Sequence, residues 1–192
     1  MKEIVLTVGP QGSGKSTFCE KIVALDPDSV LISRDAVLID LFGSVFLDSY
    51  SGGHIHAYEV MWEMVKRELQ TSKKSRLILD VWNGTSQDRG GILQILRGLG
   101  AEKVVAWYFI TPIEVVQEWF WKKPGVARTS DMKDRRGEQV VYFSDSTPSR
   151  DYVLFSKFAK EIDKESFDRV VRVNPLLATP EEFLTTQTGQ VV

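Results

Sequence analysis

A glycine-rich loop between an apolar run and a stretch of helical pattern constrains this chain more than any other feature. Residues 9–17 read GPQGSGKST and match the pattern G-x-x-x-x-G-K-[ST] in full. The apolar run Ile4–Val8 precedes the loop, and Ser16–Leu25 follows it with helical spacing. A strand, such a loop and a helix in that order form a phosphate-binding loop, or P-loop. The pattern therefore predicts an α/β domain that binds a nucleotide.

The residue types of the loop explain its chemistry. Glycines let the backbone curl so that successive N–H groups face phosphate oxygens, and the following helix adds its positive dipole end. Lys15 can reach the β- and γ-phosphates, and the Ser16 hydroxyl can ligate Mg²⁺. We therefore expect ATP and Mg²⁺ to bind here. The predicted nucleotide-binding residues are Gly9, Gln11, Gly12, Ser13, Gly14, Lys15, Ser16 and Thr17.

Short apolar runs alternate with stretches of helical pattern along the 192 residues. The runs are Ile4–Val8, Ser29–Ile32, Leu77–Val81, Val104–Phe109 and Val170–Val173. The stretches that suit crossover helices are Ser16–Leu25, Ala57–Leu69, Arg89–Leu99, Ile113–Trp121 and Tyr152–Ile162. Nearly continuous apolar strands are typical of parallel sheets covered on both faces. We predict a single-domain P-loop NTPase fold over residues 1–184, with an open parallel five-stranded sheet and helices on both faces, and a frayed tail over residues 185–192.

Composition and charge narrow the functional classes. The apolar content of 43% and charged content of 26% are ordinary for a globular domain. The formal net charge of −2 gives no general attraction for nucleic acid. No apolar run approaches the roughly 18 residues of a membrane span, and the N-terminus lacks a signal-peptide layout, so we expect a cytoplasmic protein that does not act at a membrane. The single Cys19 is expected in the core, and no pattern predicts the oligomeric state.

P-loops occur in switches, motors and kinases, so other residues must distinguish these classes. The chain has no N-K-x-D guanine signature, which argues against a GTPase. The third apolar run carries Asp80 followed by Val81, whereas motor-type ATPases usually place a water-activating glutamate after that aspartate. A small kinase is the class that remains.

Two carboxylates follow predicted strands, at the sheet edge where open α/β sheets bind ligands. Asp35 follows the second run, and we predict that it accepts the proton of an attacking hydroxyl. The alternative is an N-cap for a helix over Ala36–Phe42, and the two roles are compatible. Asp80 is predicted to hold Mg²⁺ with Ser16 or to contact the acceptor, because a buried strand rarely ends in an unpartnered aspartate. Weaker candidates on the following segment are Asn83 and Arg89.

A basic segment follows the fourth run. Residues 122–136 read KKPGVARTSDMKDRR, with six basic residues against two acidic ones. Pro124 and Gly125 break the preceding helix, which predicts a mobile basic lid. Kinases use such lids to exclude water from the γ-phosphate in transit. Arg128, Arg135 and Arg136 are candidates to stabilise its charge, and Arg128 joins the predicted catalytic set. The alternative is a solvated charged loop.

Three smaller signals concern the same site. Trp119 and Trp121 precede the basic segment, and we favour packing over base stacking for both. Asn174-Pro175 follow the last run, where many P-loop kinases bind the adenine. The H-x-H at residues 54–56 lacks a third ligand and is a weak metal candidate.

The segment KEIVLTVGPQGSGKST followed by ISRD resembles the kinase domain of bacteriophage-type polynucleotide 5′-hydroxyl kinases and related small kinases such as the zeta toxins. The family's Asp-Thr-Asn is matched loosely by residues 80–83. The resemblance implies ATP and Mg²⁺ as cosubstrates, Lys15 and Ser16 at the phosphates, Asp35 as the base and a lid arginine at the transition state. Polynucleotide kinases hold an acceptor phosphate with an arginine three residues beyond the base, where this chain has Leu38.

These features predict an ATP-dependent phosphotransferase that moves the γ-phosphate to a hydroxyl acceptor, with a polynucleotide 5′-hydroxyl as one candidate. The predicted catalytic residues are Asp35, Lys15, Arg128 and Asp80, and the predicted metal ligands are Ser16 and Asp80. A nucleoside, sugar nucleotide or antibiotic is the alternative acceptor. A nucleotide-gated binding module that hydrolyses ATP slowly is the alternative from another class.

Overall fold

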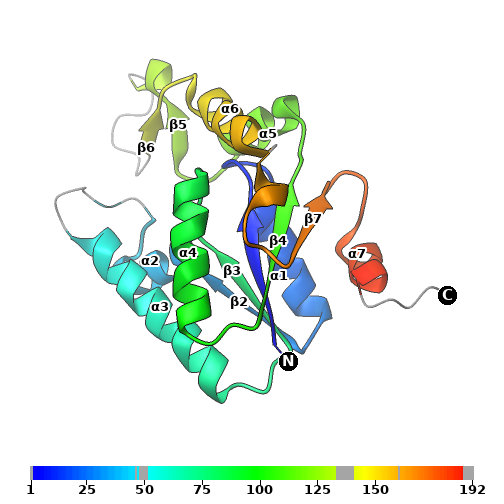
Figure 1. The fold of residues 1–192 in the computed structure, drawn as a ribbon. Helices are drawn as coiled ribbons and strands as arrows, with labels where there is room; N and C mark the ends of the chain where they lie inside the picture. The colour runs from blue at the N-terminus through cyan, green and yellow to red at the C-terminus, as the bar shows by residue number, and fades with distance from the viewer. Residues whose placement is uncertain (1, 46, 48–51, 133–140, 160, 188–192) are drawn as a thin grey trace.

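The computed structural model of the chain describes residues 2–45, 47, 52–132, 141–159 and 161–187. Its main strands are β1 Glu3–Val8, β2 Ser29–Ser33, β3 Arg76–Asp80, β4 Lys103–Phe109 and β7 Arg169–Val173. They form one five-stranded sheet in the order β2-β3-β1-β4-β7, and every pair is parallel. The predicted sheet is therefore confirmed. Because all strands run the same way, their carboxyl ends share one edge (Figure 1).

Helices cover both faces of this sheet (Figure 1). They are α1 Lys15–Leu25, α2 Arg34–Phe42, α3 Gly53–Thr71, α4 Ser86–Gly98, α5 Ile113–Trp121, α6 Thr147–Ala159 and α7 Pro180–Gln187. Side chains of β1 alternate between two cores: Ile4 and Leu6 pack with α2, α3 and α4, whereas Val5 packs with α1 and α7. Both cores exclude water, which explains the uninterrupted apolar character of the strand. Cys19 is fully buried in the second core, as predicted.

Two helices differ from the prediction. The prediction of Tyr152–Ile162 was wrong at both ends, because α6 begins at Thr147 and ends at Ala159. Pro148 stands in the first turn of α6, where a backbone N–H has no partner within the helix and its absence costs no hydrogen bond. The apolar pattern used for the prediction did not indicate that the helix begins here. The helix α7 was not predicted. A capping box starts it, since Thr179 and Glu182 exchange side-chain and backbone hydrogen bonds of 2.8 and 3.2 Å, and the helix runs to Gln187.

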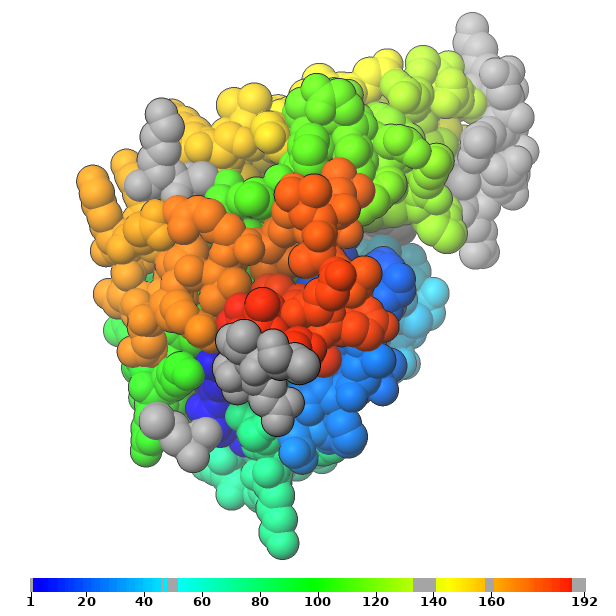
Figure 2. Space-filling model, turned by 90° about the vertical axis from the view of Figure 1, so that its right-hand side faces the viewer, coloured from blue at the N-terminus to red at the C-terminus, as the bar shows by residue number. Residues whose placement is uncertain are grey.

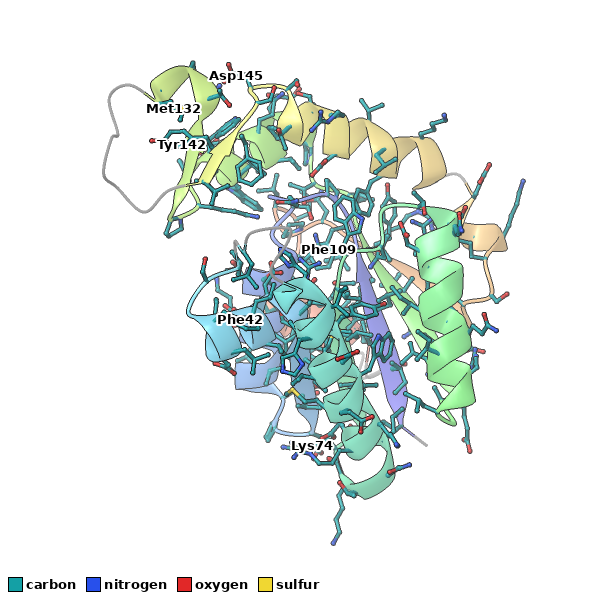
Figure 3. All side chains as sticks on the ribbon, turned by 90° about the vertical axis from the view of Figure 1, so that its left-hand side faces the viewer. Phe42, Lys74, Phe109, Met132, Tyr142 and Asp145 are labelled. Carbon is teal, nitrogen blue, oxygen red and sulfur yellow. The ribbon has the colours of Figure 1, made fainter. Side chains whose placement is uncertain are left out.

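The predicted lid contains secondary structure. The strands β5 Val126–Arg128 and β6 Val141–Phe143 form a two-stranded parallel sheet between α5 and α6. Three-residue strands are too short to be recognised from an apolar pattern. The four elements α5, β5, β6 and α6 lie together over the carboxyl edge of the main sheet (Figures 1 and 3). Two predicted lid residues, Arg135 and Arg136, lie outside the described residues.

Candidate nucleotide and phosphoryl-transfer site

The P-loop connects β1 to α1 and fits closely against α5. Gly12 and Gly14 have φ angles of 84° and 87°, which side chains rarely adopt. A Cβ at Gly12 would lie 2.6 Å from the carbonyl oxygen of Val116, and a Cβ at Gly14 would lie 2.7 Å from a ring carbon of Trp119. Glycine is therefore required at both positions by conformation and by space.

Two hydrogen bonds support the shape of the loop. The Ser13 hydroxyl donates to the carbonyl of Pro10 at 2.8 Å. The buried Thr111 hydroxyl, on the connection from β4 to α5, donates to the carbonyl of Ser13 at 2.7 Å. The backbone that would receive phosphates is thus preorganised, which limits the conformational cost of binding.

Lys15 lies over the loop. Its Nζ donates to the carbonyl oxygens of Gly9 and Pro10 at 2.8 and 2.9 Å. Desolvation by burial lowers the pKa of Lys15, and the nearby Asp80 carboxylate partly offsets that effect. An incoming phosphate can replace the two carbonyls as the partner of the ammonium group, with a stronger charge-assisted bond.

The structure brings Ser16 and Asp80 into direct contact. One carboxylate oxygen of Asp80 accepts from the Ser16 hydroxyl at 2.8 Å, and the other accepts from Thr7 at 2.7 Å. Hydroxyl and carboxylate oxygens are hard donors of the kind that suits Mg²⁺. No group of three or more histidine, cysteine or acidic side chains gathers for a metal within the described residues. The pair would therefore share the cation with phosphate oxygens and water, as is usual for Mg²⁺.

Asp35 stands at the same edge of the sheet, in the first turn of α2. Its side chain is 62% exposed and lies 3.2 Å from the Arg34 guanidinium. The N-cap alternative for Asp35 was wrong, because α2 begins at Arg34 and the Ser33 hydroxyl accepts from the Ala36 amide at 3.5 Å. The Asp35 carboxylate still interacts electrostatically with Lys15. It is thus available to a ligand above the P-loop.

The residue at the position of the polynucleotide kinases' acceptor-binding arginine, Leu38, is fully buried in the core. Its side chain takes no part in the site. An acceptor phosphate would have to find another cation.

Comparisons with known proteins identify the family. Residues 4–141 match the AAA domain family. The chain belongs to this family. A probable UMP-CMP kinase 2 from Arabidopsis thaliana is 30% identical over 116 residues, which cover 58% of this chain and 44% of that protein. The chain spans about half the length of the curated relatives it matches.

Solved structures confirm the P-loop kinase fold of this AAA domain. The chain resembles a structure of the Pnkp1/Rnl/Hen1 RNA repair complex with a TM-score of 0.64 and 16% identity, over 85% of this chain and 47% of that one. It also resembles shikimate kinase from Acinetobacter baumannii with a TM-score of 0.55 and 17% identity, over 100% and 96% of the two chains. Identities this low establish the fold and not the substrate.

Arg128 does not join the P-loop residues of the AAA domain. Its guanidinium lies 2.9 Å from Asp145 and 4.4 Å from the ring centroid of Trp121. Trp121 directly follows Phe120 on α5, so the two side chains leave the helix about 100° apart. Figure 3 shows Asp145 at the outer end of this region, away from the labelled Phe109 that ends β4. The catalytic role of Arg128 therefore stays a prediction, and in this structure its guanidinium is engaged by Asp145 and Trp121.

Lys123 is an exposed residue two positions past the end of α5, and sequence reasoning did not single it out. Its Nζ lies 5.5 Å from the ring centroid of Phe120, a residue that abuts Gly12. Desolvation lowers the pKa of Lys123, and the carboxylates of Asp35, Asp80 and Asp151 partly offset that effect. The segment KKPG could have indicated Lys123, because its two lysines stand between α5 and the helix-breaking residues Pro124 and Gly125.

The weaker candidates Asn83 and Arg89 are supporting residues in this AAA domain. Both are 1% exposed. Arg89 pairs with Glu165 through bonds of 2.5 and 2.7 Å and also donates to the backbone carbonyl of Asn83 at 3.0 Å. The Asn83 amide donates to the backbone of Thr7 at 2.6 Å. This network fixes the segment after β3 against β1. The same strand carries Thr7, whose hydroxyl donates to Asp80.

Trp119 and Pro175 flank the start of α1. A Cβ at Gly14 would lie 2.7 Å from the Trp119 ring and 3.6 Å from Cγ of Pro175. Figure 2 shows the loop after β7, in orange, against α5, in green. Two apolar side chains from separate elements therefore lie beside the end of the P-loop, and the preference for packing over base stacking at Trp119 and Trp121 stays a prediction.

None of the helices within the described ranges is long and apolar enough to cross a membrane.

Proposed function

We propose that this AAA domain is an ATP-dependent kinase that transfers the γ-phosphate to a hydroxyl acceptor. The observation that carries the proposal is the 2.8 Å contact between Ser16 and Asp80, made directly beside Lys15. P-loop kinases need a hydroxyl and a carboxylate at this position to hold Mg²⁺ and a lysine to hold the phosphates. The kinase names of its curated relatives support the same chemistry.

In the proposed mechanism, Lys15 exchanges the carbonyls of Gly9 and Pro10 for oxygens of the β- and γ-phosphates. Ser16 and Asp80 hold Mg²⁺, which when bound neutralises charge on the phosphates. Asp35 accepts the proton of the acceptor hydroxyl on a carboxylate oxygen as that hydroxyl attacks the γ-phosphorus. The γ-phosphate leaves ADP and joins the acceptor oxygen.

The cation that neutralises the transferring phosphate is proposed to be Lys123. Its charge interacts with those of Lys15, Asp35 and Asp80, whereas the guanidinium of Arg128 is paired with Asp145. A lysine near the P-loop gains a charge-assisted partner when a phosphate binds.

The adenine is proposed to lie between Trp119 and Pro175. Both side chains approach Gly14, the last glycine before the phosphate-binding helix. An aromatic face and a proline ring give apolar surfaces that suit a purine and need no hydrogen-bond match.

A transfer assay with γ-labelled ATP tests the proposal. We expect label on at least one member of a panel of 5′-hydroxyl RNA and DNA oligonucleotides, nucleosides, sugar nucleotides and hydroxyl-bearing antibiotics. Label on the oligonucleotides would identify a polynucleotide acceptor, and label elsewhere would identify a small one. Release of free phosphate alone, across the whole panel, would contradict a kinase and favour the nucleotide-gated binding module.

A comparison of Lys123→Ala with Arg128→Ala tests which cation acts. Loss of a preorganised charge at a transferring group costs on the order of 10²-fold in rate, and we expect this for Lys123→Ala. Arg128→Ala should change the rate less than about twofold, because exposed ion pairs contribute little. Initial transfer rates, or ATP hydrolysis rates before an acceptor is known, provide the measurement. A larger loss from Arg128→Ala would reverse the assignment.

A further inference from the structure

Thr7 is a buried polar residue in a strand that is otherwise apolar at this point. Its neighbours along β1 are Val5, Leu6 and Val8, and Thr7 itself is fully buried. Valine is β-branched like threonine and would fill the same place without a polar atom. A buried hydroxyl is costly unless it makes a hydrogen bond, so a threonine at this position calls for an explanation.

The partner of the Thr7 hydroxyl is Asp80 on the neighbouring strand. The register of the parallel pair β1 and β3 places Leu6 opposite Leu79. The next residues along, Thr7 and Asp80, therefore stand side by side, and the hydroxyl donates to Asp80 Oδ1 at 2.7 Å. The contact follows from the register of two buried strands and does not depend on the position of a loop.

The two carboxylate oxygens of Asp80 have different partners. Oδ1 accepts from Thr7, whereas Oδ2 accepts from the Ser16 hydroxyl at 2.8 Å. The last torsion of an aspartate side chain has a broad, roughly two-fold preference, so a carboxylate without bonds turns easily. The bond from Thr7 restrains this torsion and leaves Oδ2 on the side of Ser16, the other predicted ligand of Mg²⁺.

The backbone around Thr7 is held as well. The Asn83 side-chain amide donates to the Thr7 carbonyl at 2.6 Å and to the Val81 carbonyl at 2.9 Å. Asn83 is buried, and its own backbone carbonyl accepts from the Arg89 guanidinium at 3.0 Å. These bonds tie the residue that follows Asp80 to β1, which supports the geometry of the bond between Thr7 and Asp80.

We propose that Thr7 is a positioning residue of the cation site, whose hydroxyl occupies Oδ1 of Asp80 and so presents Oδ2, together with Ser16, to Mg²⁺. The inference rests on the proposed function, because it takes Asp80 and Ser16 as the ligands of the cation. Groups that bond to a metal ligand orient that ligand, and their loss lowers metal affinity by roughly 10–100-fold. Thr7 acts on ATP binding only through Mg²⁺.

The test compares ATP affinities measured by calorimetry with Mg²⁺ present and with Mg²⁺ removed by a chelator, so it requires no acceptor. The ratio of the two affinities gives the contribution of the cation. Thr7→Val keeps the branched shape and removes the hydroxyl, and we expect it to lower this ratio about tenfold. Its ATP affinity without Mg²⁺ should stay close to that of the parent, because no phosphate contact is lost. Thr7→Ser keeps the hydroxyl and should retain most of the ratio, although it loses a buried methyl group.

Thr111→Val is the matched control. It makes the same substitution at a second buried threonine, whose hydroxyl donates to the Ser13 carbonyl in the loop. It should change both affinities alike and leave their ratio in place. The inference is overturned if Thr7→Val keeps the parental ratio. It is also overturned if Thr7→Ser loses as much of the ratio as Thr7→Val, which a role in packing alone predicts. A parent that binds ATP equally with and without Mg²⁺ contradicts the proposed metal site as well, whereas the other two outcomes leave the proposed function intact.

Discussion

Replacing Lys15 by alanine should abolish phosphoryl transfer and weaken the binding of ATP far more than that of adenosine. The Lys15 ammonium lies over the loop with two carbonyl oxygens as its partners, ready to meet the β- and γ-phosphates. A desolvated charge–phosphate contact of this kind contributes on the order of 10³-fold to the rate, or about 4 kcal/mol. Calorimetric titration with ATP, ADP and adenosine measures how much of the lost binding affinity depends on the phosphates.

The control for this variant is Lys122→Ala. Lys122 is exposed and pairs with Glu118 one turn earlier on α5, so it carries the same charge without contacting the loop. It should bind ATP like the parent. Equal ATP affinity in Lys15→Ala and the parent would remove Lys15 from the phosphate site and leave the loop without its main cation.

Asp35→Asn should lower the transfer rate by about 10²–10⁴-fold, which corresponds to roughly 3–5 kcal/mol of barrier. Asparagine keeps the size of the side chain but cannot take the hydroxyl proton. ATP affinity should barely change, because Asp35 is largely exposed and meets the acceptor hydroxyl, not the triphosphate, in the proposed mechanism. Transfer rates at saturating ATP, together with ATP affinities, check both expectations.

Stability measurements separate this role from a helix cap. Ser33 caps α2, so Asp35→Asn and Asp35→Ala should each change the free energy of unfolding by less than about 0.5 kcal/mol. Ser33→Ala should lose about 1 kcal/mol and keep most of its transfer rate per folded molecule. An Asp35→Asn variant that transfers phosphate at nearly the parental rate would refute the general-base assignment and with it the likeness to polynucleotide kinases in mechanism.

The main sheet could be predicted from the sequence because each of its strands is buried on both faces. Val5 and its neighbours on β1 exclude water whichever way they point, so the apolar run is continuous and its limits are sharp. The short strands β5 and β6 offer no such run. The helix α7 was missed because its buried contact is mainly one ring, Phe183, which packs against Phe18 and Trp107 at centroid distances of 5.4 and 4.9 Å.

The site could be predicted where strand ends supply its residues. Parallel strands end at one edge, so Asp80 had to emerge near Lys15 and Ser16 in the loop after β1. No such rule places the residues beyond α5. Lys123 follows α5 and contacts the ring of Phe120, whereas Arg128 on β5 contacts that of Trp121, and nothing in the sequence pattern distinguishes the two.

Because α5 packs against the P-loop, a substitution in the loop would require a change in the position of α5. A side chain at Gly12 would collide with the main chain of α5 at Val116, which no change of rotamer can relieve. Any lineage that altered this glycine would have to displace α5, and with it Lys123 and the elements that follow. Gly12 is therefore constrained twice, once by its left-handed backbone and once by the main chain of α5 that packs against it.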